Sequence, residues 1–173
     1  MVLTIQIDTR EHKAELKRIE QQFDAMGVEH FRSKCFVGDY QSIDNGRLVV
    51  DRKKDLQEII GNVTTQHERF RRELVRASQA GIKIVVLCEH GKGIKTMDDV
   101  RKWHNPRLDM MKFAVVDGKA CKVKAYPNAT TGERLAKTLE SISERYDVRF
   151  VFCQPSETGE TIVRLLGGGA GGG

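Results

Sequence analysis

The sequence lacks any apolar run that approaches the roughly 18 residues a membrane-spanning helix needs. It also lacks a basic segment followed by an apolar stretch near its start, because acidic and basic side chains appear early between Met1 and Lys13. A secretory signal peptide is therefore not expected. These two absences predict a cytoplasmic protein with no membrane partner.

Cysteine is scarce and scattered. Cys35, Cys88, Cys121 and Cys153 are far apart and form no CxxC pair, which argues against both a zinc site and a disulfide framework. Three of them, Cys35, Cys88 and Cys153, lie in apolar, strand-like runs. We expect these three to be buried thiols.

No large excess of either charge is present, since 29 lysines and arginines face 24 acidic residues for a formal net charge of +5. This mildly basic balance suits a polyanionic partner, but many proteins without such a partner share it. At 173 residues the chain is most simply one domain. We assign residues 1–166 to that domain and residues 167–173 to a flexible glycine-rich tail.

The hydrophobic pattern alternates between strand-like and helix-like segments. Strands are expected at residues 2–8, 35–43, 47–52, 82–90 and 149–153. Helices are expected at residues 12–26, 55–60, 66–80, 96–103, 130–146 and 156–166, with Thr130 and Glu133 forming a capping box for the fifth. Residues 105–128 resemble a loop with two weak strands, at 113–116 and 122–126.

Two strand features predict the kind of sheet. The nearly continuous apolar run at residues 82–90 is typical of a strand covered on both faces, and it is the best candidate for a central strand. Asn45-Gly46 predicts a tight hairpin between the two strands that flank it, which requires one antiparallel pair. The sequence therefore predicts an α/β fold with a central mixed β-sheet flanked by helices.

The hairpin carries two acids and a lysine. Asp39 lies near the start of its first strand and Asp51 near the end of its second, positions that can face one another in an antiparallel pair. Lys53 follows Asp51 by two residues and points to the same side of the strand. Neighbouring carboxylates repel unless a cation lies between them, and Mg²⁺ prefers a few carboxylates together with water and phosphate oxygens. The group therefore suits a divalent metal. Lys53 would position or deprotonate a metal-bound water, or stabilise charge that develops on a phosphate. The alternative is a solvated hairpin with surface salt bridges.

An acid, a spacer and then (Asp/Glu)-x-Lys is the pattern of the PD-(D/E)xK nuclease superfamily, and a longer ordered series here resembles its XPF-type nuclease domain. That domain occurs in eukaryotic and archaeal structure-specific endonucleases, with the signature V-D-x-R-E, then G-D-x, then E-R-K-x-x-x-D, then a hydrophobic strand ending near an acid. The matching segments are Ile7-Asp8-Thr9-Arg10-Glu11, Gly38-Asp39-Tyr40, Val50-Asp51-Arg52-Lys53 and Leu87-Cys88-Glu89. The likeness covers residues 2–90, and the second half more loosely resembles small stand-alone members such as those encoded by bacteriophages.

The resemblance implies a restriction-endonuclease-like core and a Mg²⁺ or Mn²⁺ site. It makes Asp39 and Asp51 metal ligands, Lys53 the catalytic lysine, and Asp8 and Glu11 further acids of the site. Two positions depart from the signature. Asp51 stands where Glu is usual, and the final acid of the motif falls at a glutamine, Gln57, with Asp55 or Glu58 nearby.

Several arginines are candidates for contact with DNA. Arg10 and Arg52 match the arginines of the motif, which either hold the acids or touch DNA. Arg69, Arg72 and Arg76 recur three and four residues apart on one predicted helix, where they form a basic side that attracts a phosphate backbone. A solvated helix face is an equally good explanation of that spacing.

The leading hypothesis is a metal-dependent endonuclease that cuts DNA, with branched or flap DNA as the substrate that the resemblance implies. The alternative is a non-catalytic DNA-binding or scaffold module that keeps the nuclease fold. A nuclease acting on RNA or on single strands is a third reading. Family members often dimerise through this domain, so the resemblance also implies a homodimer.

Overall fold

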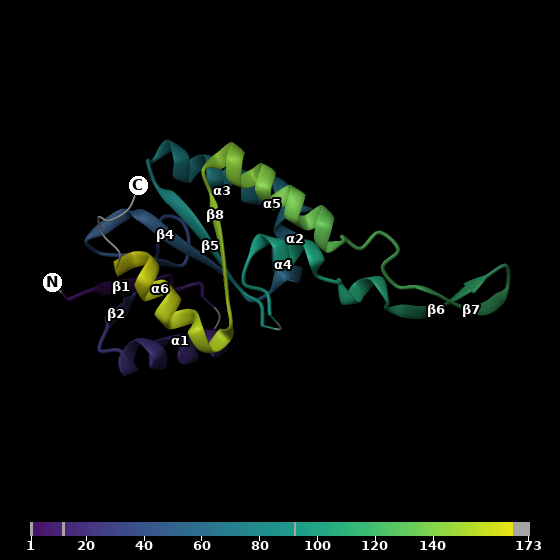
Figure 1. The fold of residues 1–173 in the computed structure, drawn as a ribbon, viewed down its shortest axis with the longest axis horizontal. Helices are drawn as coiled ribbons and strands as arrows, with labels where there is room; N and C mark the ends of the chain where they lie inside the picture. The colour runs from purple at the N-terminus through teal and green to yellow at the C-terminus, as the bar shows by residue number, and fades with distance from the viewer. Residues whose placement is uncertain (1, 12, 92, 168–173) are drawn as a thin grey trace.

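The computed structural model describes residues 2–11, 13–91 and 93–167. Its centre is a mixed sheet of six strands in the order β2-β1-β3-β4-β5-β8 (Figure 1). These strands are β1 (Thr4–Ile7), β2 (Glu29–Arg32), β3 (Tyr40–Ser42), β4 (Asn45–Lys53), β5 (Lys83–Glu89) and β8 (Arg149–Cys153). The pairs β1–β3 and β3–β4 are antiparallel, whereas β1–β2, β4–β5 and β5–β8 are parallel. The predicted mixed sheet is thus confirmed.

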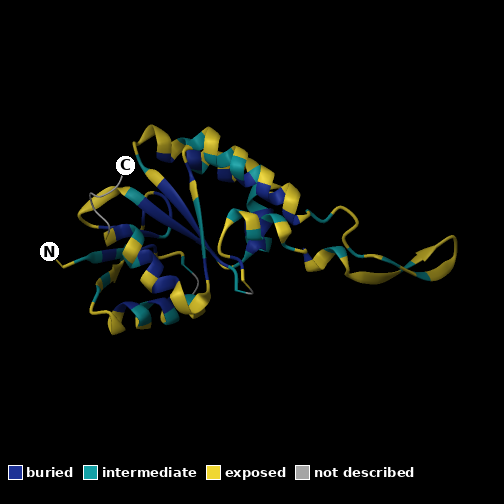
Figure 2. Ribbon diagram, viewed as in Figure 1, coloured by how far each residue is buried: buried dark blue, intermediate teal, exposed yellow. Residues whose placement is uncertain are grey.

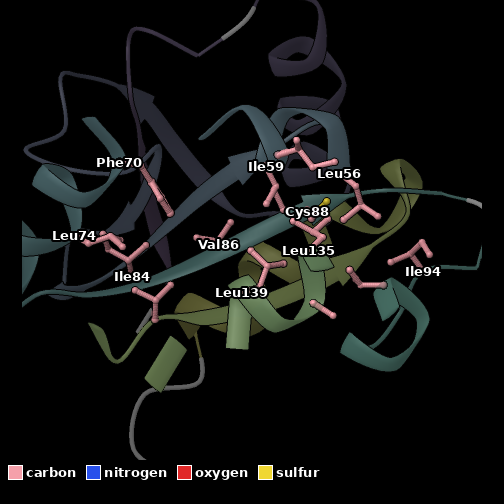
Figure 3. Packing of buried hydrophobic residues seen from close by; sticks show 14 of the residues in the cluster. Leu56, Ile59, Phe70, Leu74, Ile84, Val86, Cys88, Ile94, Leu135 and Leu139 are labelled. Carbon is pink, nitrogen blue, oxygen red and sulfur yellow. The ribbon is translucent and has the colours of Figure 1, made fainter. Parts of the chain in front are cut away.

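Helices cover both faces of the sheet (Figure 1). They are α1 (Lys13–Ala25), α2 (Leu56–Val63), α3 (His67–Gln79), α4 (Met97–Lys102), α5 (Gly132–Tyr146) and α6 (Thr158–Gly167), with two short 3₁₀ turns, η1 (Pro106–Leu108) and η2 (Pro155–Glu157). Helices α1 and α6 bury apolar side chains against one face. Helices α2, α3, α4 and α5 bury theirs against the other, where Leu56, Phe70, Val86 and Leu139 belong to one cluster (Figure 3).

Strand β5 is buried on both sides, as its apolar run predicted. Ile84, Val86 and Cys88 belong to one of the two apolar clusters and Leu87 belongs to the other. The strand lies between β4 and β8, so it is an interior strand one place from the edge of the sheet. Strand β5 pairs in parallel with β4 from Leu48 to Lys53, and so supports the end of β4 that carries Asp51 and Lys53.

The first hairpin exists, but its turn is not where the sequence placed it. Residues Ile43 and Asp44 form the turn, and Asn45-Gly46 are already the first residues of β4. A shift in register between Gln41 and Ser42 accounts for the difference, because it pairs Ser42 with Asn45. The expected strand at residues 35–43 is accordingly only three residues long, and β2 was not expected at all.

Two further expectations need correction at helix ends. The cap of α5 is Thr131, whose side chain accepts a hydrogen bond from the Arg134 N–H at 3.2 Å, and not Thr130. Gly167, which we assigned to the tail, is the last residue of α6, and residues 168–173 lie outside the described residues.

The segment expected to be a loop with two weak strands contains a second hairpin, formed by β6 (Met111–Val116) and β7 (Lys119–Lys124). Both strands overlap the expected ones and begin two to three residues earlier. Its two turn residues, Asp117 and Gly118, have φ angles of 51° and 75°, the left-handed conformation of the tightest hairpin turns. The hairpin stands away from the body of the protein (Figure 1) and is largely exposed (Figure 2).

Cys35, Cys88 and Cys153 are buried free thiols, as expected. Among the helices of the described segments, none has the length and apolar character needed to cross a membrane.

Candidate active site

The end of β4 places alternate side chains on opposite sides of the sheet. The Lys53 ammonium lies 3.0 Å from Oδ1 and 2.8 Å from Oδ2 of Asp51. Only the contact with Oδ1 has the geometry of a hydrogen bond, so Oδ2 is a buried carboxylate oxygen with an ion-pair contact and no hydrogen-bond partner in the described part of the chain. Arg52, between these two residues, points to the other side.

Asp39 is held beside them by backbone hydrogen bonds. Its N–H donates to the carbonyl of Val50 at 2.9 Å and its carbonyl accepts from the Asp8 N–H at 2.7 Å. Its carboxylate oxygen Oδ2 accepts from the backbone N–H of Arg52 at 2.8 Å. The side chain of Asp39 is therefore anchored next to the residue that follows Asp51.

Gly38 explains how the chain reaches this position. Its φ angle is +69°, and a Cβ atom there would lie 3.1 Å from Cγ2 of Val49 and 3.2 Å from the carbonyl oxygen of Val50. A side chain is excluded both by the left-handed backbone and by the nearness of β4. Glycine thus allows Asp39 to pack against the strand that carries Asp51.

The charges in this group act strongly on one another. Burial raises the pKa of Asp39, and the carboxylates of Asp51 and Glu11 raise it further, against the opposing effects of Lys53 and the Arg52 N–H. Burial would lower the pKa of Lys53, but the carboxylates of Asp51 and Asp39 outweigh it and the pKa is raised. The acids repel one another, and a positive charge between them is stabilising.

These three residues open onto one cleft of about 300 Å³. The cleft is also lined by Arg10, Glu11, Glu15, Gly38, Arg52, Lys54, Glu58, Arg69 and Glu73. The structure therefore brings Asp39, Asp51, Lys53 and Glu11 to one cleft. Glu58, one of the two acids expected near the end of the motif, lies on this surface at the start of α2. Glu15 and Glu73 also belong to it but were not expected, because α1 and α3 contribute them from separate parts of the chain.

Arg52 and Glu11 belong to a buried ion-pair network. Arg52 Nη2 donates to Glu11 Oε1 at 2.7 Å, and the side chains are 4% and 6% exposed. Arg52 Nη1 lies 3.2 Å from Glu89 Oε2, and Arg18 Nη2 donates to both oxygens of Glu89 at 2.8 Å. The Tyr40 hydroxyl donates to Glu11 Oε2 at 3.1 Å. Of the two roles implied for Arg52, the structure favours holding acids, because so buried a guanidinium is out of reach of DNA.

Asp8 is not among the described residues that line the cleft. Its Oδ1 accepts from the backbone N–H and Nε of Arg10 at 2.8 and 2.7 Å, and its Oδ2 accepts from Arg10 Nη2 and the Cys35 N–H at 2.9 and 2.7 Å. Burial would raise the pKa of Asp8, but these hydrogen bonds from Arg10 and Cys35 outweigh it and hold the pKa below its usual range. Both carboxylate oxygens are thus engaged in fixing two neighbouring loops.

The remaining arginines have different surroundings. Arg10 is 61% exposed and lines the cleft, as does Arg69 on α3. Arg76 donates to the carbonyl of Phe36 at 3.2 Å and lies over its ring, whereas Arg72 is exposed on the same helix. Arg10 and Arg69 are therefore the arginines best placed to meet a ligand in the cleft.

Residues after the motif have structural contacts. Asp55 caps α2 by accepting from the Glu58 N–H at 2.8 Å, and Gln57 Nε2 donates to Asn105 Oδ1 at 2.5 Å. His90 Nδ1 accepts from the Leu56 N–H at 3.1 Å, and its ring packs edge-on against Trp103. These contacts hold the start of α2 next to Lys53.

The donors at the cleft fit a divalent cation. The described residues hold no group of three or more His, Cys, Asp or Glu side chains arranged around a metal position, so the protein would contribute the two carboxylates of Asp39 and Asp51. Mg²⁺ is usually held by one or two carboxylates, with waters and substrate phosphates completing its coordination. The buried Oδ2 of Asp51, with no hydrogen-bond partner among the described residues, is a ready donor.

Comparisons with known proteins bear on the family and the fold of the chain. A family model described as the ERCC4 domain matches residues 7–165. The solved structure of XPF from Aeropyrum pernix is similar, with 15% sequence identity and a TM-score of 0.59 over 94% of this chain and 63% of that chain. The structure of XPF from Aeropyrum pernix in complex with DNA gives 15% identity and a TM-score of 0.60 over 95% and 63%. At 15% identity the likeness to these two structures shows the fold alone. The chain spans less than two thirds of the length of either solved chain. A comparison with curated proteins gives no significant match.

Proposed function

This chain belongs to the ERCC4 domain family and has the fold of an XPF-type nuclease domain, and from that premise we propose that it is a divalent-metal-dependent endonuclease acting on DNA. The observation that carries the proposal is the meeting of Asp39, Asp51 and Lys53 in one cleft. Two carboxylates and an ammonium at one place are the groups that phosphodiester hydrolysis with a metal requires.

Asp39 and Asp51 would hold Mg²⁺ or Mn²⁺. A bound ion of this kind supplies Lewis-acid stabilisation of a phosphate and a more acidic water. The fold prepares the site in advance, because the Arg52 N–H fixes the Asp39 carboxylate at 2.8 Å.

Lys53 would act on the reacting phosphate or on the attacking water. Its side chain is 12% exposed and its ammonium is paired with Asp51, so it reaches the cleft from a fixed position. A fixed positive charge stabilises the negative charge that develops on a phosphate during hydrolysis. Arg10 and Arg69, at the border of the cleft, would bind neighbouring phosphates of the backbone.

Glu11 and Asp8 would support the site through the residues they hold. Glu11 lines the cleft and pairs with Arg52, whereas Asp8 orients Arg10. Loss of either acid would therefore disturb a cationic side chain.

The proposed substrate is branched or flap DNA, and the proposed assembly is a homodimer. DNA as the ligand is supported by a similar solved structure, that of XPF from Aeropyrum pernix in complex with DNA. The preference for branched DNA rests on the family resemblance.

The function is tested by incubating the protein with linear, nicked, flap and four-way-junction DNA, with Mn²⁺ and with a chelator. Asp39→Asn and Lys53→Ala should abolish metal-dependent cleavage while the far-ultraviolet circular dichroism stays unchanged. Asp98→Asn is a matched control, since Asp98 is 79% exposed on α4. Cleavage by both site variants at the rate of the control variant would overturn the proposal.

A second candidate function, a non-catalytic DNA-binding module, is favoured by one observation. The carboxylates of Asp8 and Glu11 accept hydrogen bonds from arginine side chains, so their arrangement also serves the fold alone. Calorimetric titration with Mn²⁺ separates the two functions. A nuclease shows binding that Asp39→Asn removes, whereas a scaffold shows no binding that depends on Asp39.

A further inference from the structure

The β6–β7 hairpin exposes apolar side chains that the fold leaves outside the core. Phe113 is 80% exposed, Val115 74% and Met111 44%. Alternation along β6 places all three on one side of the ribbon. Large exposed apolar side chains gathered on one surface mark a site of interaction.

Lysines flank this apolar row. Phe113 is paired across the strands with Lys122, and Met111 with Lys124. Lys112 and Lys119 lie on the opposite side of the same ribbon, and Asp117 in the turn is the one acidic residue between positions 110 and 126. The ribbon thus combines an apolar row with cations on both sides, which suits a polyanion that also has an apolar surface.

A second copy of the chain fits this surface less well. Two identical ribbons packed with their apolar rows together would bring the Lys122 and Lys124 ammonium groups of both copies close to one another. Like charges directly opposite one another are destabilising. Charge complementarity therefore favours a nucleic acid over self-association.

The hairpin is also continuous with the candidate active site. Lys54 and Glu58 line both the cleft that holds Asp39, Asp51 and Lys53 and an adjoining cleft that extends to Arg107. Arg107 in turn lines a third cleft that reaches Tyr126, at the foot of the hairpin. Its guanidinium carbon lies 5.0 Å from the centre of the Tyr126 ring. Three adjoining clefts therefore connect Lys54, next to Lys53 in the active-site cleft, to the base of the hairpin.

Two hydrogen bonds to the segment just before β6 close the base of the hairpin. Lys124 Nζ donates to the carbonyl of Leu108 at 2.7 Å, and the Ala125 N–H donates to the carbonyl of Met110 at 2.8 Å. The two-residue turn at Asp117 and Gly118 keeps the strands in one register. The ribbon is thus a projection built to hold its shape and not a loose loop.

We propose that the β6–β7 hairpin is an arm that binds duplex DNA on one side of the cleavage site. The choice of DNA as the ligand rests on the proposed function. A two-stranded ribbon fits the major groove of B-form DNA, which is about 12 Å wide. Phe113 and Val115 face the bases and sugars of that groove, and Lys122, on the same side of the ribbon, contacts a phosphate at its border. Lys119, next to the turn, contacts a phosphate at the tip of the hairpin.

The test is duplex binding measured by fluorescence anisotropy in chelator, so that neither metal nor cleavage is involved. The full chain carries the double substitution Lys119→Ser/Lys122→Ser. Its matched control, Lys17→Ser/Lys137→Ser, removes two exposed lysines of α1 and α5 and leaves the same net charge. A single variant, Phe113→Ser, removes the apolar contact alone.

The arm predicts a distinct result for each variant. Loss of two phosphate contacts lowers the magnitude of the slope of log K against log salt by about 1.8 relative to the control pair. Phe113→Ser weakens duplex binding roughly fivefold or more with the slope unchanged. Single-stranded DNA of the same length binds all variants alike.

The proposal is wrong if the hairpin double variant binds duplex DNA with the same affinity and salt slope as the control pair. It is also wrong if the double variant loses affinity for single-stranded DNA alone. A change in sedimentation showing that the hairpin joins two copies of the chain would contradict it as well. Failure of the proposed function is separate. If the proposed nuclease function is wrong, Asp39→Asn still cleaves DNA, and duplex binding measured in chelator does not change.

Discussion

Arg52 and Glu11 form an ion pair at 2.7 Å in which both side chains are almost fully buried, at 4% and 6% exposure. Glu11 also accepts a hydrogen bond from Tyr40, and Arg52 reaches Glu89 on β5. The pair thus joins the segment after β1 to β4 and β5, next to the cleft.

Glu11→Ala should lower the free energy of unfolding by about 3 kcal/mol, because removing one partner leaves a buried charge poorly compensated. Glu89 still pairs with Arg52, which keeps the loss near the lower end of the usual range. Urea denaturation gives the value. Glu15→Ala is the control, since Glu15 lines the same cleft from α1; equal losses for the two variants would contradict the structural role of Glu11.

The carboxylate of Asp8 should make the free energy of unfolding depend on pH. Its pKa in the folded state lies below the ordinary value of 3.8, so the unfolded chain binds the proton more readily. The stabilisation is present above the unfolded pKa and is lost as the pH falls through the folded pKa.

Asp8→Asn should therefore cost about 2 kcal/mol at neutral pH, where charged hydrogen bonds are lost, and less as the pH falls below about 4. Urea midpoints measured from about pH 7 down to about pH 3 provide the check. A difference between the two proteins that stays constant over this range would show that Asp8 does not act through its charge.

Gly38 should tolerate no side chain. Gly38→Ala adds a Cβ atom 3.1 Å from Val49 at a φ angle of +69°, whereas Gly27→Ala has a φ angle of +67° and nothing within 4 Å. The control therefore reports the backbone strain alone, about 1 kcal/mol.

We expect Gly38→Ala to lose about 1 to 3 kcal/mol more than Gly27→Ala and to lose cleavage at temperatures where it is still folded, because Asp39 is displaced. Thermal unfolding and a cleavage assay on the same samples test this. The position of Asp39 does not depend on Gly38 if both variants cut DNA equally well.

Much of the site could be predicted from the sequence because its residues are local. Asp51 and Lys53 share a face by the period of a strand, and the same period implies that Arg52 points to the other face. Asp39 required one long-range step, the pairing of two strands, which the turn residues signalled even though the turn lies at Ile43 and Asp44.

The other features depended on tertiary packing or on a missed signal. Glu15 and Glu73 reach the cleft from two helices, and no local pattern joins them. The engagement of Asp8 by Arg10 and Cys35 depends on how two loops pack. For the second hairpin the two strands were expected, and the missed signal is the turn that joins them, because Asp117-Gly118 is a strong turn dipeptide.

Lys53 and Lys54 offer the sharpest comparison, since they are adjacent and both line the cleft. Lys53 is 12% exposed and paired with Asp51, whereas Lys54 is exposed. Lys53→Met should lower kcat by roughly 10² to 10³ with little change in KM, because it removes charge stabilisation at the reacting phosphate. Lys54→Met should raise KM, leave kcat unchanged and reduce the salt slope of binding by about 0.9, because it removes one phosphate contact. Single-turnover cleavage over a range of salt separates the two effects. If Lys53→Met changes KM alone, this lysine binds DNA without taking part in hydrolysis, and the catalytic cation must be another residue of the cleft.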